Sequence, residues 1–200
     1  MLVGKRMSKE PVTVGAQDNL ATARAKMRAG RFRRLPVVEE GRLAGILTEG
    51  DIREHLGNLE GTKVKACMTE GLLTVTPGTT LEEAATTLLN HKIGALPVLD
   101  DGRLVGIITT SDILRAFLDV MGASEPGTAR IDLLLEGEQY GLASASKTIV
   151  EEGGEVLGLG TYRERWGESP ICYLRVRGAD LEGIANRLRK RGYNVLGVHL

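Results

Sequence analysis

The sequence contains few residues of the kinds on which several protein classes depend. Of its 200 residues, two are cysteine, three are histidine and one is tryptophan. Cys67 and Cys172 lie far apart and form no metal-ligand spacing with the histidines, so we expect reduced thiols in a cytoplasmic protein and no metal site. No apolar run approaches the ~20 residues of a membrane helix, and residues 1–11 lack the apolar stretch of a secretory signal. We therefore expect no contact with a membrane.

An excess of charge of one sign is also missing. The 26 basic and 26 acidic residues leave a net charge of zero, which argues against a general nucleic-acid binder. An apolar content of 42% is that of a folded protein, and the 26 glycines lie between apolar segments, as turn residues do. No Ser/His/Asp set, Cys/His pair or carboxylate pair indicates a catalytic centre, so we expect a protein that is not an enzyme.

What the sequence does contain is an internal repeat. When the chain is shifted by 61 residues, residues 35–52 fall on residues 96–113 without a gap, and 11 of the 18 positions are identical. The same register places Met7 on Met68. This agreement indicates a duplicated unit of about sixty residues.

Each copy has the pattern β-α-β-β-α. In copy two, Thr80 and Glu83 form a capping box at the start of a helix. The apolar face of this helix is predicted to be Leu81, Ala84, Ala85, Leu88 and Leu89. The strands of copy one are predicted at residues 12–14, 35–38 and 43–47, with a glycine-containing turn at 39–42 and a second helix beginning near residue 48.

The repeated strings Leu-Pro-Val, Gly-Arg-Leu-x-Gly-Ile and Thr-x-x-Asp-Ile resemble those of the CBS domain, and the tandem resembles a Bateman module. The resemblance covers residues 7–119 and implies units at residues 1–60 and 61–122. It also implies that the two units pack through their sheets and bind adenosine nucleotides or related ligands in the clefts between them. The ligand would then regulate an attached or partner protein.

The Thr-x-x-Asp motif occurs once in each copy, and two hypotheses explain it. Thr48 with Asp51, and Thr109 with Asp112, fit a capping box that needs no ligand. Alternatively, the free N–H groups of the helix start suit a phosphate, and the carboxylate can accept hydrogen bonds from the two hydroxyls of a ribose. The resemblance assigns the aspartates to the ribose, the threonines to the phosphate, and the backbone around residues 12–14 and 35–37 to the base. The candidate nucleotide-binding residues are Thr13, Arg33, Arg34, Pro36, Val37, Thr48, Asp51, Thr74, Pro97, Val98, Thr109 and Asp112.

The copies differ most in a basic run that only copy one has. Its members are Arg24, Lys26, Arg28, Arg31, Arg33 and Arg34, and the last two correspond to Gly94 and Ala95 in copy two. The run is either a solvated helix face with its loop, a pair of arginines that reach ligand phosphates, or a nucleic-acid patch. We rank the last of these lowest because only Phe32 interleaves with the charges.

The C-terminal third has a different composition. Residues 123–128 are predicted to be a linker, and residues 129–200 a ferredoxin-like domain of order βαββαβ. This segment resembles an ACT domain through Gly141 and Leu142 after the first strand, with Tyr140 in place of the usual proline. The resemblance implies dimerisation or binding of an amino acid or another small ligand there. We expect Ile171, Tyr173 and Arg175 to lie on an open sheet face that meets a partner.

The whole sequence is similar to stand-alone bacterial CBS–ACT proteins of the acetoin-utilisation type. It predicts a mixed α/β (α+β) regulatory protein that pairs with a second chain as a homodimer and controls a partner protein that the sequence does not identify. The expected ligand is an adenine nucleotide (AMP, ADP or ATP) or a relative such as NAD or S-adenosylmethionine. The alternative hypothesis is a structural assembly module whose two clefts stay empty.

Overall fold

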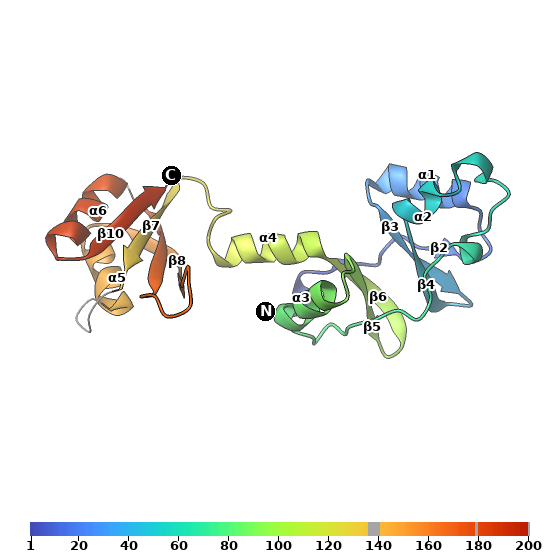
Figure 1. Cartoon of the computed structure of the whole chain (residues 1–200), viewed down its shortest axis with the longest axis horizontal. Coiled ribbons are helices and arrows are strands. Elements are labelled where there is room, and N and C mark those ends of the chain that lie inside the picture. Colours follow the sequence, from blue (N-terminus) through green and yellow to red (C-terminus); the bar gives the residue numbers. More distant parts are fainter. Residues whose placement is uncertain (136–140, 179, 200) are drawn as a thin grey trace. The chain divides into compact units, whose positions relative to one another are not determined.

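The computed structural model describes residues 1–135, 141–178 and 180–199. Its contacts divide the chain into two compact units, Met1–Leu114 and Arg115–Leu200. Figure 1 shows the elements of both along the chain. In the described part of the chain, every helix is too short or too polar to cross a lipid bilayer.

The first unit contains both repeats, and each repeat forms a small sheet with helices. Copy one consists of β2 (Val14–Gly15), α1 (Leu20–Gly30), β3 (Arg34–Glu39), β4 (Arg42–Thr48) and α2 (Glu49–Arg53). Copy two consists of α3 (Leu81–Asn90), β5 (Ala95–Asp100), β6 (Arg103–Thr109) and α4 (Thr110–Val120). Single helical turns lie at η1 (Val3–Lys5), η2 (Leu56–Asn58) and η3 (Val64–Ala66).

The local signals in the sequence place most of these elements correctly. The capping box of Thr80 and Glu83 starts α3, and Asn19 caps α1 by accepting a hydrogen bond from the N–H of Thr22 at 2.9 Å. Both hairpins turn through two residues of positive φ; in copy one these are Glu40 and Gly41. This is the geometry that matches the twist of the flanking strands.

The φ angles are 51° at Glu40 and 77° at Gly41, and 46° at Asp101 and 74° at Gly102.

Two predictions for this unit were wrong in detail. The strand expected at residues 12–14 is β2, shifted to Val14–Gly15, and its counterpart in copy two is a single bridge from Val75 to Val98.

The helix of copy two also buries less of its apolar face than the spacing predicts. Leu81, Ala84 and Leu88 are buried, whereas Leu89 is 75% exposed. Leu89 lies at the edge of the apolar face of α3, where the helix surface no longer faces the sheet. Copy one packs a continuous core around Leu20, Leu35 and Leu47, each fully buried.

The segments that lead into the two repeats are exchanged between them. β1 (Ser8–Lys9) belongs to copy one in sequence but pairs antiparallel with β6 of copy two, with Ser8 opposite Ile107. The equivalent residue Thr69 bridges to Ile46 in β4 of copy one. The N–H of Val3 donates to the carbonyl of Thr79 at 2.9 Å. The equivalent N–H of Val64 donates to Asp18, also at 2.9 Å.

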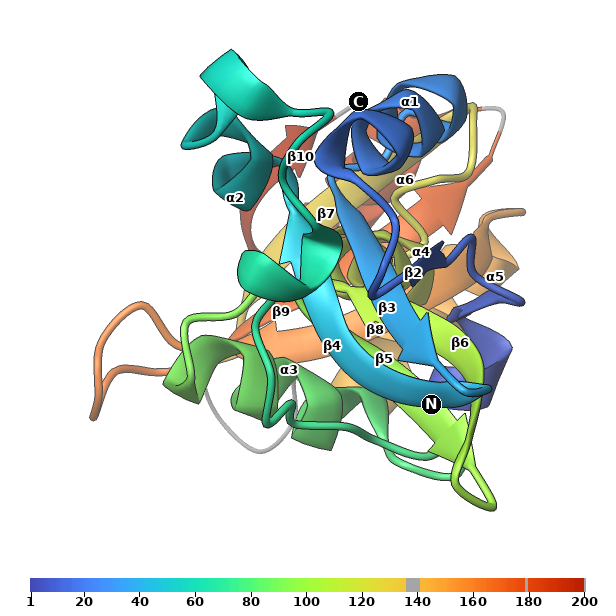
Figure 2. The same cartoon turned by 90° about the vertical axis from the view of Figure 1, so that its right-hand side faces the viewer.

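Two glycines make room for these leading segments, which we define as residues 1–9 and 62–69. A Cβ built on Gly45 would lie 2.8 Å from the carbonyl oxygen of Thr69. A Cβ on Gly106 would lie 3.1 Å from the carbonyl oxygen of Ser8. The glycines therefore let a backbone cross close over each sheet. Because each repeat includes a segment of the other, the two form one folded unit in space (Figure 2).

The second unit has the element order βαββαβ that the sequence predicts. Its elements are β7 (Thr128–Leu134), α5 (Leu142–Glu151), β8 (Glu155–Tyr162), β9 (Ile171–Arg177), α6 (Leu181–Lys190) and β10 (Asn194–His199). The antiparallel sheet has the order β10-β7-β9-β8. One face packs on α5 and α6 through a core that includes Ile131, Leu133, Ile149, Leu174 and Leu188.

The opposite face of this sheet is less apolar and less open than the alternation predicts. Ile171 is only 8% exposed, and the backbone of Met121 and Gly122 lies against Arg175 and Gly158. The remaining part carries an ionic and aromatic cluster instead of an apolar surface. The segment after α4 therefore covers the end of this face at Arg175.

That cluster is centred on Arg130. Its Nε donates to Asp132 at 2.7 Å, and its guanidinium lies 5.5 Å and 5.2 Å from the ring centres of Tyr162 and Tyr173. Nε2 of His199 lies 3.3 Å from the other oxygen of Asp132. The hydrogen bond to Asp132 raises the pKa of Arg130 further above its ordinary value, so this cation remains charged under all conditions in which the protein folds.

Candidate functional site

The first unit contains two clefts that are related by the repeat. The first, which we call the Asp112 cleft, has a volume of about 370 Å³; it is lined by Ser8, Lys9, Glu10, Pro11, Val12, Phe32, Arg33, Arg34, Pro36, Ile107, Thr109 and Asp112. The second, the Thr48 cleft, has a volume of about 500 Å³; it is lined by Arg34, Ile46, Thr48, Thr69, Gly71, Leu72, Leu73, His91, Lys92, Ile93, Gly94, Ala95 and Pro97.

The two linings correspond almost residue for residue at a spacing of 61. Pro36 corresponds to Pro97, and Val12 corresponds to Leu73. In each cleft, one copy supplies the threonine of its Thr-x-x-Asp motif. The other copy supplies a leading segment and the proline of a Leu-Pro-Val strand. Because the exchanged segments bring these parts together, neither repeat could form a complete cleft alone.

The Thr-x-x-Asp motifs form the capping boxes that the spacing predicts. In copy one, Oδ2 of Asp51 accepts from the N–H of Thr48 at 2.7 Å and from its hydroxyl at 2.8 Å, and the N–H of Asp51 donates to Oγ1 of Thr48 at 3.3 Å. In copy two, Asp112 and Thr109 make the same three contacts at 2.9, 2.6 and 3.3 Å. The cap uses Oδ2 in both copies, so a ligand in the Asp112 cleft would meet the other carboxylate oxygen of Asp112.

Each cleft also exposes an apolar side chain from the segment before the first strand. Val12 is 49% exposed and Leu73 is 42% exposed. Large apolar side chains at equivalent positions of two related clefts would lose contact with water when a flat apolar group binds. Both clefts therefore combine an apolar wall with the threonine of a helix start, and the Asp112 cleft also contains a carboxylate.

The arginines divide unequally between the clefts. Arg33 lines the Asp112 cleft, and Arg34 lines both clefts. Nε of Arg33 lies 3.9 Å from a carboxylate oxygen of Glu49, in an ion pair whose side chains are 83% and 58% exposed, so solvent screens this contact. The Thr48 cleft receives further positive charge from Lys92.

Five of the predicted nucleotide-binding residues do not line either cleft. They are Thr13, Val37, Asp51, Thr74 and Val98. Val37 and Val98 are fully buried in the sheets, because the residue after the proline points to the core side of the strand. The carbonyl of Thr13 accepts from Nζ of Lys26 at 2.8 Å.

Sequence reasoning missed the contribution of the leading segments. Ser8 belongs to copy one in sequence but pairs with β6 of copy two, and Thr69 belongs to copy two but bridges to β4 of copy one. In these exchanged positions both residues line a cleft. The available signal was that the repeat register extends upstream to Met7 and Met68. That register shows that the segments are equivalent, but it does not show that they are exchanged.

Cys67 lies beside the first Thr-x-x-Asp motif, with its Sγ 3.6 Å from Nε2 of His55. Burial raises the pKa of this thiol, and the carboxylates of Asp51 and Glu54 raise it further. A protonated thiol is a poor metal ligand. In residues 1–135, 141–178 and 180–199, no cluster of side chains is suited to hold a metal ion.

In the second unit, Gly141 precedes α5 as its N-cap and makes no side-chain cap, and Leu142 packs against the core. Tyr140, the third residue predicted for this site, lies outside the described residues.

Comparison with known proteins identifies the repeats. The CBS domain family matches residues 3–58 and 64–119, which together are more than half of the chain. The chain belongs to the CBS domain family. The two matches coincide with the two structural repeats, so this chain carries a CBS pair.

Curated proteins similar to this CBS pair differ in size. A CBS domain-containing protein of Dictyostelium discoideum is 33% identical over 141 residues, covering 63% of this chain and 97% of the relative. Inosine-5′-monophosphate dehydrogenase of Staphylococcus aureus is 32% identical over 158 residues, covering 76% of this chain but only 31% of the dehydrogenase. This chain therefore spans about a third of that enzyme.

Similar solved structures cover the CBS pair. The acetoin utilization protein AcuB assigned in Vibrio cholerae has a TM-score of 0.56 at 32% identity, over 63% of this chain and 98% of that chain. The CBS pair of protein MJ0100, solved with 5′-methylthioadenosine and S-adenosyl-L-methionine, has a TM-score of 0.54 at 31% identity, over 58% and 95%. CBSX2, solved with AMP, has a TM-score of 0.52 at 29% identity, over 58% and 96%. Related CBS pairs thus bind adenosine compounds.

Proposed function

We propose that this protein is a regulatory sensor that binds an adenine nucleotide, or a relative such as NAD or S-adenosylmethionine, in the clefts of its CBS pair. The observation that carries the proposal is the equivalence of the two clefts. Each presents an apolar wall, a helix start with its Thr-x-x-Asp cap, and cationic side chains within one cavity. An adenine ring, a ribose and a phosphate require these three features in the same order.

We propose a place in the clefts for each part of the ligand. The base would lie against Val12 or Leu73, and the ribose hydroxyls would donate to Oδ1 of the motif aspartate. In the Asp112 cleft the phosphate would pair with Arg33 and Arg34. A neutral nucleoside has no phosphate and could not form these ion pairs. The related structures solved with AMP and with S-adenosyl-L-methionine support an adenosine ligand.

The proposed division of the chain follows the sequence. Residues 1–60 and 61–122 are the two CBS units, residues 123–128 a linker, and residues 129–200 an ACT-like domain. This last domain would join two chains as a homodimer or bind a small ligand near Tyr140, Gly141 and Leu142. We propose that the protein acts in the cytoplasm by controlling a partner protein, without catalysis and without binding nucleic acid or membrane.

A binding screen tests the nucleotide site. The full chain is heated with AMP, ADP, ATP, NAD or S-adenosylmethionine, and each stabilising compound is then titrated by calorimetry. A ligand at a hundred times its dissociation constant should stabilise the folded state by about 2.7 kcal/mol. If none of the five compounds stabilises the protein, the protein is an assembly module with empty clefts. The Thr-x-x-Asp motifs then serve only to cap their helices.

A further inference from the structure

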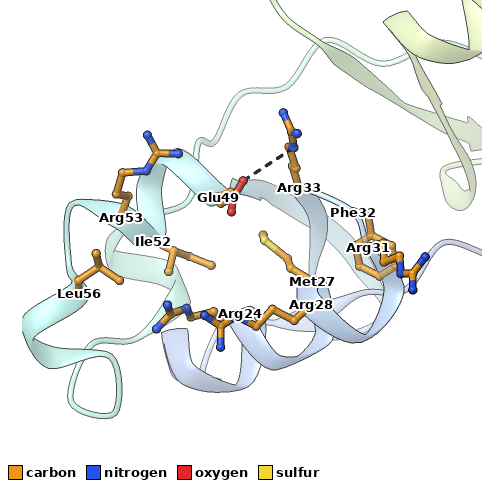
Figure 3. Close-up of a pocket in the computed structure, with 10 residues that line it drawn as sticks. All are labelled: Arg24, Met27, Arg28, Arg31, Phe32, Arg33, Glu49, Ile52, Arg53 and Leu56. Atoms are coloured by element: carbon orange, nitrogen blue, oxygen red, sulfur yellow. Dashed lines mark ion pairs between the residues drawn. The ribbon is translucent and has the colours of Figure 1, made fainter.

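A third cavity lies in copy one, between α1 and α2 (Figure 3). It has a volume of about 340 Å³, which is in the range of small-molecule sites. Its lining is formed by Arg24, Met27, Arg28, Arg31, Phe32, Arg33, Glu49, Ile52, Arg53 and Leu56. We call it the arginine pocket, because five of these ten residues are arginines.

The five arginines come from α1, the loop after it and α2. Arg24 and Arg28 are one turn apart on α1, so they share a face of the helix. Arg31 ends α1 in the left-handed conformation, with φ of 53°. Arg53 comes from α2 on the other side (Figure 3). In Figure 3, Arg24 and Arg28 lie together beside the cavity, whereas Arg31 and Arg53 extend away from it. Met27 and Ile52 make the floor of the cavity apolar.

The charge in this pocket is not neutralised by the protein. Glu49 is the single acidic residue of the lining, and it pairs with Arg33 at 3.9 Å. In the described part of the chain, Arg24, Arg28, Arg31 and Arg53 make no ion pair. Guanidiniums around a common cavity repel one another, so their proximity costs stability unless an anion binds.

The second repeat shows that the fold does not require these charges. The residues of copy two that correspond to Arg24, Arg28 and Arg53 are Ala85, Leu89 and Leu114. Copy two forms the same pair of helices with these uncharged side chains. Arg24, Arg28 and Arg53 are therefore an addition to the common fold and not part of its packing.

We propose that the arginine pocket binds a compact anion that carries several phosphate groups, at a site separate from the two clefts. Guanidiniums pair with phosphate oxygens through two parallel hydrogen bonds, and several of them can do so only when the anion presents several phosphates. The cavity is too small for a macromolecular segment to fill. The anion would be a free polyphosphate or the polyphosphate tail of a nucleotide held in the Asp112 cleft, which also contains Phe32 and Arg33.

Titration of the full chain with inorganic tripolyphosphate tests this proposal. Calorimetry should show one tripolyphosphate per chain, tighter than orthophosphate and weakened by added salt. Arg24→Gln/Arg28→Gln should weaken binding at least about tenfold, since each lost charged hydrogen bond costs that much or more. The thermal midpoint of this variant should not fall, because two repelling charges are removed. Arg42→Gln/Arg103→Gln is the matched control; these exposed residues line neither the clefts nor the pocket.

Asp112→Ala shows whether tripolyphosphate binds in the arginine pocket or in the Asp112 cleft. ATP and AMP distinguish the two sources of the anion, because only a nucleotide tail in the pocket would make Arg24→Gln/Arg28→Gln weaken ATP more than AMP. If the pocket binds free polyphosphate, this variant binds tripolyphosphate as the wild type does, whatever happens to its affinity for AMP. If tripolyphosphate binding falls with Asp112→Ala, or equally in the two double-arginine variants, the anion occupies a cleft or the general surface and the proposal is wrong. The proposal is also wrong if tripolyphosphate does not bind the wild type and light scattering shows that Arg24→Gln/Arg28→Gln separates a dimer. The two arginines would then belong to a contact between chains. Absence of nucleotide binding would contradict the proposed sensor function alone.

Discussion

The guanidinium of Arg34 lies in the space that a side chain on Gly94 would occupy. Arg34 belongs to the first repeat and Gly94 to the second, where it stands in the position of Arg33. One repeat thus supplies a cation to the cleft that the other repeat helps to line. The unequal charges of the two copies are a feature of the paired structure and not of two independent sites.

Gly94→Ala should displace Arg34 without unfolding the protein. The atoms in the way are the end of a flexible side chain, which can rotate at small cost. We expect an unchanged midpoint of thermal unfolding and a changed preference among AMP, ADP and ATP, as measured by calorimetry. A large fall in the midpoint would show that Arg34 is held in place by the packing, contrary to this expectation.

Single substitutions of the two arginines should have different effects on phosphate recognition. Affinity should rise from adenosine to its phosphorylated forms and fall with salt. Arg33→Gln should reduce this rise in one cleft, whereas Arg34→Gln should reduce it in both, because only Arg34 lines both. Two-site titrations of each variant measure this, and adenosine itself serves as the control ligand. If both variants have the phosphate preferences of the wild type, Arg33 and Arg34 do not contact the ligand and belong to a solvated surface.

Asp112→Ala should weaken nucleotide binding about ten- to a hundredfold, the value of a lost charged hydrogen bond. Asp51→Ala should have a smaller effect, since Asp51 does not line the Thr48 cleft. Both changes also remove a capping box, which typically contributes about 1 kcal/mol to stability.

Glu83→Ala separates these two effects. Glu83 completes the capping box of α3 with Thr80 at 3.0 Å but lines neither cleft. This control should lose stability and keep its affinity for nucleotide. A dideoxy form of the ligand on the wild type supplies the reverse control, because it removes the hydroxyls and keeps the cap. Equal affinities of all variants would contradict the assignment of the aspartates.

Gly45→Ala should destabilise the first unit by about 1–3 kcal/mol, as overpacking does. The added methyl would meet the carbonyl of Thr69, which is backbone and cannot rotate away. Gly57→Ala is the control, since a Cβ there meets nothing within 4 Å. Urea unfolding of both variants measures the difference. If Gly45→Ala is as stable as Gly57→Ala, residue 69 does not cross β4 as described.

The buried thiol of Cys172 should make stability depend on alkaline pH. Burial, followed by the charge of Asp132, raises the pKa of Cys172 from 9.0 to about 11. Between these values the unfolded chain releases the proton and the folded chain keeps it, so the free energy of unfolding decreases as pH rises. This contribution is complete below pH 9 and is lost as pH rises through about 11. Urea unfolding of wild type and Cys172→Ala across this window measures it; parallel curves would contradict the prediction.

The sequence predicted the elements whose signals are local. The capping boxes at Thr48 and Thr80 depend on residues three positions apart, and the hairpin turns depend on adjacent residues, so neither needs the rest of the fold. The prediction was weaker where burial decides. The motif predicts that the backbone of Val37 meets the ligand, and only the pleat of β3 shows that its side chain faces the core.

By itself, the sequence determined the duplication, the order of elements in each repeat, the type of topology in the second unit and the position of the Thr-x-x-Asp motifs. These follow from periodicity, capping and turn chemistry, which act between neighbours in the chain. Only the tertiary structure decided that the leading segments cross between repeats, that Arg34 lines both clefts, and that arginines of α1 and α2 surround one cavity. These contacts join residues far apart in sequence, and they depend on sheet register and on which side chains the core leaves room for.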